Sequence, residues 1–358
     1  MLTAIVAILI FCGLVTVHEF GHFALAKLCK MYVQEFSIGM GPLICSKQWG
    51  ETMYSLRAIP VGGFVRVLGE DIAEEESKDI PQVDIPDERR YQNRPVWQRM
   101  LFAAAGPGMN FVTAILIFAV MFWVLGVAVP IENPDTSISS VVVDSPAEEA
   151  GIVAGDKIIA VEGQEVHTWK EMTALISQSE KEQLNVVILH GEEERTIQIE
   201  PMISEDGKKV LGIYANSAER RPVGVIEGIT LGCKTTGEMV VMMGQVLGDL
   251  FTGQIDIMDE EEGLTGPVGI VKIIDQSTKA GWIYVANLAA LLSVNLAVLN
   301  LLPIPSLDGS KLVFLLIEGI RGKAIDPMKE GYINFIGFAL MMLLVVVVTF
   351  KDVVNLIR

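Results

Sequence analysis

Residues 2–26, LTAIVAILIFCGLVTVHEFGHFALA, form an apolar stretch that carries His18, Glu19 and His22 in its second half. Residues 2–17 contain no charge, and the first basic residue is Lys27. About 20 apolar residues in a helix cross the hydrocarbon core of a bilayer. The stretch lacks the basic start and the small-residue cleavage site of a secretory signal peptide. We therefore expect a retained membrane-spanning helix with three polar residues inside it.

The rest of the chain supports a polytopic membrane protein. The chain has 358 residues, of which 51% are hydrophobic, and a mean hydropathy of +0.45, which is too apolar for an ordinary soluble protein. Three further stretches without charge lie at 100–131, 282–307 and 331–350. We expect four transmembrane helices in all, at 1–29, 100–130, 282–307 and 331–350, with a tail at 351–358.

The net charge bears on the partners of the protein, and the positions of the basic residues bear on its orientation in the membrane. The net charge of −17 argues against nucleic-acid binding, and the acidic runs at 70–77 and 258–263 are expected to be solvated loops. Basic residues near cytoplasmic membrane surfaces orient membrane proteins. They concentrate between the first two spans and between the last two: Lys27, Lys30, Lys47, Arg57, Arg66, Lys78, Arg89, Arg90, Arg94 and Arg99, then Lys311, Arg321, Lys323 and Lys329. Both of these loops, 30–99 and 308–330, are therefore predicted to be cytoplasmic, with the N-terminus and residues 132–281 outside.

Residues 30–70 have a strand-like pattern. The segments YVQEFSIGMGPLICS and ETMYSLRAIPVGGFVRVLG predict a β-hairpin or small sheet, with Pro60, Gly62 and Gly63 at a turn or kink. Such a sheet can dip into the membrane if protein shields it from lipid, and an exposed edge can receive an extended peptide by strand addition. A small cytoplasmic hairpin is the alternative, and the pattern does not decide between them.

Residues 136–204 predict a separate α/β module of strands with a helix around TWKEMTALISQ. His167 and His190 lie in this module, where surface or capping roles are expected. The following segment, 205–281, is predicted to link the module back to the membrane through amphipathic helices. Within it, residues 222–257 indicate a surface helix rather than a fifth span.

The HEFGH sequence at 18–22 has a direct chemical meaning. Positions four apart share one helix face, so His18 and His22 can present imidazole nitrogens to one metal ion. Glu19 borders the same face and can act as a general base on a water at the metal without being a ligand. Ionisable groups inside a membrane are costly and mark functional sites. The alternative is a pair of histidines that only hydrogen-bond within a helix bundle.

A zinc site needs a third protein ligand, and NLAVLNLLPIPSLDGSKL at 295–312 supplies the candidate. Pro303 and Pro305 break the third span, and Asp308 follows near the same membrane face as the histidines. Gly309 suits a special backbone turn. Asn300, inside the span, either hydrogen-bonds a substrate carbonyl or bridges helices.

These motifs together resemble the bacterial site-2 proteases, and most closely their regulator-of-sigma-E protease group. The matching stretches run in order through nearly the whole chain: HEFGH, FSIGMGP, GETMYSLRAIPVGGFVRVLGE, WQRMLFAAAGPGMNF and NLLPIPSLDG. The resemblance implies a zinc ion held within the membrane by His18, His22 and Asp308, with Glu19 as the catalytic base. It implies a membrane re-entrant β-loop at 50–70, an α/β module of the PDZ type, and substrate-binding positions at Asn300, Asn110, Gly62 and Gly63.

The chain departs from this family in three places. Better-known relatives carry two tandem PDZ domains, and this chain has room for one. Ser310 follows the LDG motif where a second glycine is common, and Gly108 replaces a usually bulkier residue. No metal ligand is affected by these departures.

The resulting expectation is an intramembrane zinc metalloprotease of a bacterial cell membrane. It would hydrolyse peptide bonds in or near the spans of single-span membrane proteins, such as anti-sigma factors and signal-peptide remnants. One alternative is a membrane-tethered PDZ adaptor without catalysis. A zinc or proton transporter is disfavoured, because the second and fourth spans contain no ionisable residue.

Overall fold

The chain folds into two compact units. The computed structural model describes residues 2–70, 85–204, 207–254 and 265–357. One unit combines Met1–Trp123 with Gly224–Arg358, and the other is Val124–Val223. The acidic run predicted at 258–263, and all of the run at 70–77 except Glu70, lie outside the described residues.

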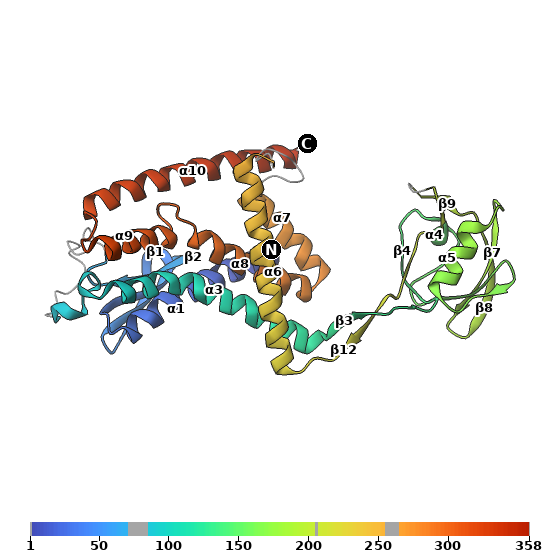
Figure 1. Cartoon of the computed structure of the whole chain (residues 1–358), viewed down its shortest axis with the longest axis horizontal. Helices are drawn as coiled ribbons and strands as arrows, with labels where there is room; N and C mark the ends of the chain where they lie inside the picture. The colour runs from blue at the N-terminus through green and yellow to red at the C-terminus, as the bar shows by residue number, and fades with distance from the viewer. Residues whose placement is uncertain (1, 71–84, 205–206, 255–264, 358) are drawn as a thin grey trace. The chain divides into compact units, whose positions relative to one another are not determined.

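Four long apolar helices form the frame of the first unit. Within the described residues, each of them is long and apolar enough to cross a membrane, which confirms the predicted number of spans. Many large apolar side chains along α10 remain exposed, including Phe335, Phe338 and Leu343, as expected for a surface that faces lipid. The four helices are α1 (Leu2–Leu28), α3 (Val96–Leu125), α8 (Trp282–Leu301) and α10 (Pro327–Ile357) (Figure 1).

The boundaries of three of these helices differ from the predicted ones. Helix α3 ends at Leu125, and residues that were predicted to continue the span form strand β3 (Val127–Pro130). Helix α8 ends at Leu301 rather than at 307, because Pro303 lacks an amide hydrogen and disfavours helical geometry at Leu302. Helix α10 extends beyond the apolar core of the predicted span at both ends.

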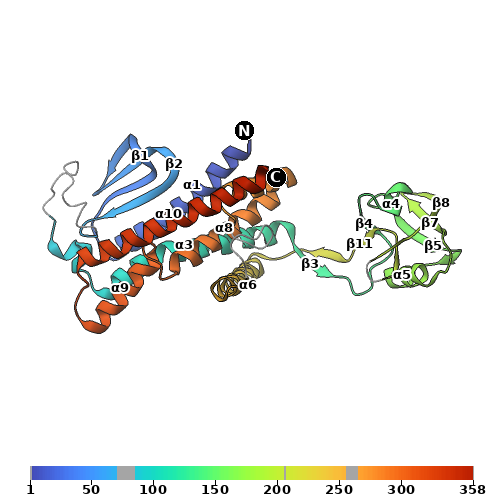
Figure 2. The ribbon, with the colours of Figure 1, turned by 90° about the horizontal axis from the view of Figure 1, so that it is seen from above.

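The predicted sheet is present as β1 (Val33–Trp49) and β2 (Thr52–Val67), beside α1 (Figure 2). Residues 35–38 of β1 pair with 63–66 of β2 on one side and with 53–56 on the other. The carboxylate of Glu35 is buried among the strands and accepts hydrogen bonds from Ser55, Arg57 and Arg66. Within the described pairings, residues 63–65 have a partner strand on one side only, which leaves a free strand edge there.

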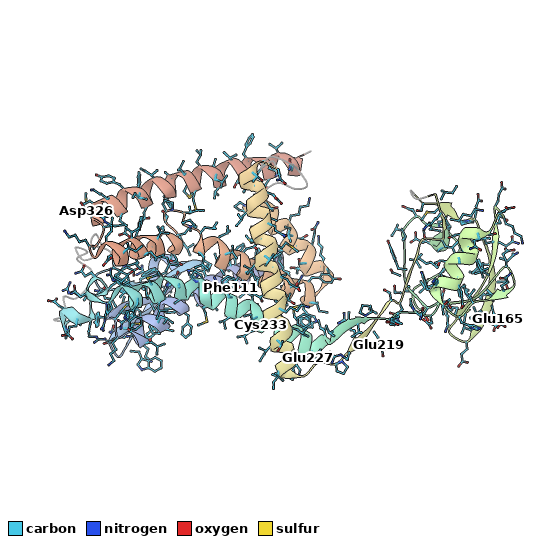
Figure 3. All side chains as sticks on the ribbon, viewed as in Figure 1. Phe111, Glu165, Glu219, Glu227, Cys233 and Asp326 are labelled. Atoms are coloured by element: carbon cyan, nitrogen blue, oxygen red, sulfur yellow. The ribbon has the colours of Figure 1, made fainter. Side chains whose placement is uncertain are left out.

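The first unit also contains three more α-helices, α6 (Val225–Thr252), α7 (Pro267–Ala280) and α9 (Asp308–Arg321), and two short 3-10 helices, η1 (Asp87–Arg89) and η2 (Tyr91–Asn93). Helix α6, which carries Cys233, lies against α3, which carries Phe111 (Figure 3). Added Cβ atoms at Gly228 and Gly232 would lie 3.0 and 2.6 Å from α3 carbonyl oxygens, so only glycine permits this approach. Among the described residues, helix α6 is not one of the four candidate spans, and its place at the membrane surface stays a prediction. Helix α9 occupies much of the region predicted as the loop 308–330.

The second unit is an α/β module with its own apolar core, which includes Ile158, Met172 and Leu184. Its helix around Trp169 begins with a capping box in which Thr168 and Glu171 bond each other's backbone amides. The module extends past the predicted boundary at 204, because β11 pairs with β4. Its elements after β3 are β4 (Ile138–Val141), α4 (Pro146–Glu149), β5 (Lys157–Val161), β6 (Gln164–Glu165), α5 (Trp169–Gln178), β7 (Leu184–His190), β8 (Glu193–Ile199), β9 (Met202–Ile203), β10 (Lys209–Val210), β11 (Ile213–Ala215) and β12 (Ala218–Arg221).

Candidate active site

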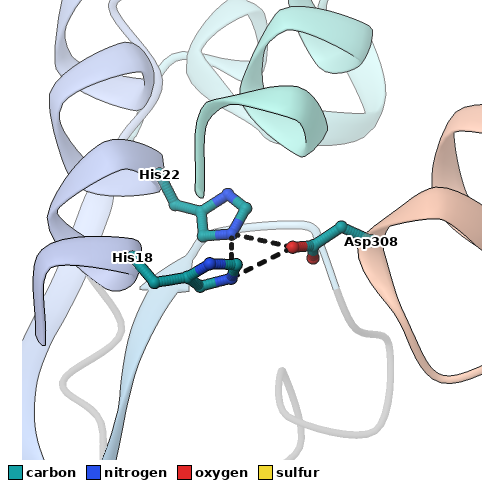
Figure 4. Close-up of side chains that lie close together, drawn as sticks. All are labelled: His18, His22 and Asp308. Atoms are coloured by element: carbon teal, nitrogen blue, oxygen red, sulfur yellow. Dashed lines mark hydrogen bonds and ion pairs between the residues drawn. The ribbon is translucent and has the colours of Figure 1, made fainter. Parts of the chain in front are cut away.

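Three side chains from distant parts of the sequence converge inside the helical unit. His18 and His22 lie one turn apart on α1, and Asp308 is the first residue of α9. The Oδ2 atom of Asp308 is 3.1 Å from Nε2 of His18 and 3.4 Å from Nε2 of His22 (Figure 4). The two Nε2 atoms are 3.3 Å apart. All three side chains are largely buried, so one nitrogen of each imidazole and one carboxylate oxygen point at the same small volume.

The turn between α8 and α9 brings Asp308 to the histidines. Ser306 has the left-handed backbone in this turn, with φ of 77°, and its amide and hydroxyl bond Asn334 of α10. Gly309 was expected to supply a special backbone turn, but it lies within helix α9. The reason for glycine is close approach, since an added Cβ atom would collide with the carbonyl oxygens of Leu301 and Leu302. Gly309 therefore allows α9 to start directly against the end of α8.

The site has the donor atoms and the space that a zinc ion requires. Two imidazole nitrogens and one carboxylate oxygen are a common catalytic zinc set, which leaves a fourth position open. The Oδ2 atom of Asp308 is buried and has no hydrogen bond of good geometry among the described residues. On the opposite side, Gly106 of α3 leaves room, because an added Cβ atom would lie only 2.6 Å from Nε2 of His18 and still closer to that of His22. Any larger residue at 106 would press against the Nε2 atoms of both histidines.

Helix α3 also contacts the far side of both imidazoles. The Nδ1 atom of His22 is 2.8 Å from the carbonyl oxygen of Phe102, and the Nδ1 atom of His18 is 3.2 Å from Nδ2 of Asn110. Phe102, Gly106 and Asn110 follow at intervals of four residues, so they share one face of the helix. A ligand histidine usually donates its second N–H to such a partner, which fixes the orientation of the ring.

Glu19 lies beside the histidines and faces a cavity of about 280 Å³. Within the described residues, no hydrogen bond or ion pair engages its carboxylate. Two of the lining residues form an ion pair, in which Nζ of Lys311 is 2.5 Å from Oε1 of Glu70. The cavity is lined by His18, Glu19, His22, Phe64, Val65, Arg66, Glu70, Phe102, Ala103, Asp308 and Lys311.

The four predicted substrate-binding residues lie in different settings. Gly63 is next to the site, where an added Cβ atom would be 3.3 Å from Cγ of Glu19, and Gly62 precedes it with a left-handed φ of 88°. Asn300 is half-buried near the end of α8 and does not line the cavity. Asn110 has no exposed surface and lies behind His18, so the structure gives it no access to a substrate. The substrate-binding prediction for Asn110 is therefore not carried further.

The sequence interpretation missed Gly106 and the carbonyl group of Phe102. Backbone acceptors carry no residue signature, so the role of the Phe102 carbonyl has no signal in the sequence. Gly106 lies in the AAAGPGMN run at 103–110, where four small residues precede Pro107. Such a run indicates close helix approach. It does not reveal which of its residues faces the histidines.

The chain is similar to known proteins over most of its length. Residues 6–344 match the family described as Peptidase family M50. A protein of Clostridium acetobutylicum is 36% identical, with 98% of this chain and 97% of that protein covered. The zinc metalloprotease RasP of Bacillus licheniformis is 32% identical, with 99% of this chain and all of that protein covered. The regulator of sigma-W protease RasP of Bacillus subtilis is also 32% identical, with 99% of each chain covered.

The likeness to a solved PDZ domain covers a smaller part of the chain. The PDZ domain of the SdrC-like protein of Listeria monocytogenes is 22% identical, covers 25% of this chain and 94% of that chain, and gives a TM-score of 0.22. The family match, in contrast, covers nearly the whole chain, including both HEFGH and the LDG motif. The two RasP relatives, which match this chain over 99% or more of their own length, carry protease names, and that of Bacillus licheniformis is named a zinc metalloprotease. This membrane protein therefore belongs to peptidase family M50, the site-2 protease family, and is a zinc metalloprotease.

Proposed function

We propose that His18, His22 and Asp308 hold the catalytic zinc ion, and that this site hydrolyses peptide bonds within the membrane. The observation that carries the proposal is the convergence of three ligand atoms, all within 4.8 Å of one another, two of which come from a helix long and apolar enough to span a bilayer. A polar cluster of this kind inside a span is costly unless it has a function. The adaptor alternative offers no reason for such a cluster and is not favoured.

Glu19 is the proposed general base. Zinc, when bound, acts as a Lewis acid that polarises the substrate carbonyl and makes water a better nucleophile. The Glu19 carboxylate lines the same cavity and has no other described partner, so it is free to take a proton from the attacking water. The same carboxyl group then delivers that proton to the amide nitrogen that leaves. Glu19 needs no bond to the metal for either step.

The free edge of β2 is the proposed substrate cradle. A transmembrane helix hides its peptide bonds in internal hydrogen bonds, so the segment must unwind before hydrolysis. Residues 63–65 are paired with β1 on one side only, next to Glu19, and an extended segment can pair with their other side as an added strand. Gly63 keeps the strand close to the catalytic carboxylate, while Gly62 sets the preceding turn. Asn300 remains a proposed contact of the substrate further along α8.

The orientation and partners are proposed from charge and from the relatives. The basic loops support an orientation with the site near the cytoplasmic face of a bacterial cell membrane and with the N-terminus and the α/β module outside. The sheet of β1 and β2 would then re-enter the membrane beside α1. Single-span membrane proteins are the substrate class, and the name of the Bacillus subtilis relative favours regulators of sigma factors over other single-span proteins. By analogy with the family, the outer module screens which substrates enter.

The test uses the purified full chain in lipid vesicles with a single-span substrate whose outer domain has been removed. We expect Glu19→Gln to retain zinc and to cleave about 10²- to 10⁴-fold more slowly, the usual contribution of a general base. Mass spectrometry of the fragments should place the cut within the membrane segment. Unchanged cleavage by Glu19→Gln, or a cut only in an exposed loop, contradicts the proposal.

A further inference from the structure

Asn110 is a fully buried amide placed directly behind one of the two histidines. Its Nδ2 atom is 3.2 Å from Nδ1 of His18, and its side chain has no exposed surface. The backbone carbonyl of Asn110 accepts a hydrogen bond of 2.8 Å from the hydroxyl of Ser293 on α8. The position of Asn110 is thus fixed by two helices, and its amide group faces a single ring nitrogen.

The geometry of the two imidazoles dictates which nitrogen carries hydrogen when a metal is bound. Both Nε2 atoms point at Asp308 Oδ2 and at each other, so the lone pairs on Nε2 are the ones available to a metal. A neutral imidazole has one protonated nitrogen, so Nδ1 must then carry the hydrogen and needs an acceptor. For His22 that acceptor is the carbonyl oxygen of Phe102.

For His18, the partner of Nδ1 is the side-chain amide of Asn110. An amide that donated its N–H to Nδ1 would leave the hydrogen on Nε2 and block the metal-binding lone pair. The Oδ1 atom of Asn110 is buried and has no described hydrogen-bond partner, so its acceptor capacity is unused. A half-turn of the amide about its Cβ–Cγ bond exchanges oxygen and nitrogen within the same volume and presents this oxygen to Nδ1.

We propose that Asn110 is a positioning residue that accepts the Nδ1 hydrogen of His18 and thereby holds Nε2 ready for zinc. Asn110 and the Phe102 carbonyl then perform the same task for the two ligands from one face of α3, on either side of the space left by Gly106. The inference rests on the proposed zinc site and replaces the predicted contact between Asn110 and substrate. The proposed role belongs to the amide oxygen of Asn110. A substitution that keeps an acceptor oxygen and one that removes it should therefore differ in zinc affinity.

The experiment measures zinc affinity of the full chain in detergent by competition with a chelator, using two substitutions of similar size. Asn110→Asp keeps an acceptor oxygen, so we expect it to bind zinc at least as tightly as the wild type. Asn110→Leu removes the acceptor, and we expect a loss of about 10- to 100-fold, the usual cost of losing the partner of a ligand histidine. Ser293→Ala is the control, because it removes the bond to the Asn110 backbone and leaves the amide group in place.

A second readout is specific for the hydrogen on Nδ1. The chain contains four histidines, so ¹⁵N-labelled histidine gives few signals. In the zinc-loaded wild type and in Asn110→Asp, the Nδ1 hydrogen of His18 should be protected from exchange with water, and in Asn110→Leu it should lose this protection. Wild-type affinity in Asn110→Leu, an equal loss in Asn110→Asp, or an equal loss in Ser293→Ala overturns the inference. Failure of the wild type to bind zinc would instead overturn the proposed function.

Discussion

Each of the two units pairs histidine with a buried aspartate, but the pairs differ in what surrounds them. In the α/β module, Nδ1 of His190 is 2.6 Å from Oδ1 of Asp156, whose other oxygen accepts the amide hydrogen of Val153. The His190 side chain is 47% exposed, against 10% and 8% for His18 and His22. Within the described residues, the cluster of His18, His22 and Asp308 is the one group of three or more whose ligand atoms could share a metal ion.

This contrast shows that contact between a histidine and an aspartate is a weak indicator of a metal site. The Asp156 carboxylate is used up by bonds that join a strand to a turn. In the helical unit, the oxygen of Asp308 and two imidazole nitrogens meet next to a glycine that leaves room for an ion. The site in the helical unit is distinguished by the convergence of several donor atoms on an open volume.

The largest difference between the two histidine–aspartate pairs is expected when each aspartate is replaced in turn. We expect Asp308→Ala to lower zinc affinity more than about 100-fold, because losing a ligand costs more than losing a ligand's partner. Asp156→Ala should leave zinc binding unchanged and lower only the stability of the α/β module. Chelator competition and thermal unfolding measure the two effects. Equal zinc affinity in both variants would remove the distinction between the sites.

A smaller effect on zinc affinity is expected when the space beside the two histidines is filled. Gly106→Ala places a methyl group against both Nε2 atoms, and we expect zinc affinity to fall about 10- to 100-fold, in the range found when ligand geometry is disturbed. Gly108→Ala is the matched control on the same helix, since an added Cβ atom there has open space around it. Zinc affinities of the two variants that agree within error would show that Gly106 does not leave room for the ion.

Much of this arrangement could be predicted from the sequence, because its parts are marked either by long apolar stretches or by short local motifs. Apolar stretches predict spans, and HEFGH predicts two ligands on one helix face. Asp308 was predicted as the third ligand because Pro303 and Pro305 end the third span shortly before it. The role proposed here for Asn110 has no signal in the sequence, since an asparagine in a span has the same appearance whether it touches substrate or orients a histidine. Gly309 was misread for a related reason, as glycine serves close approach and left-handed turns equally.

The smallest expected effect concerns the histidine of the α/β module. We expect His190→Ala to lower the free energy of unfolding of this module by about 1 kcal/mol, the typical contribution of one hydrogen bond. The zinc content of the His190→Ala variant and its cleavage of a membrane substrate should match those of the wild type. Chemical denaturation followed by the fluorescence of Trp169 would measure the change, and loss of zinc from this variant would contradict the assignment of the metal to the helical unit.

The most direct measurement of the central claim is X-ray absorption at the zinc edge on the purified full chain. The account predicts one zinc ion bound only by nitrogen and oxygen, with two imidazoles at about 2.0–2.1 Å. In Asp308→Ala, the same site should hold little zinc at equal free metal. A sulfur atom bound to the metal, or a spectrum with a single imidazole, would contradict the site formed by His18, His22 and Asp308.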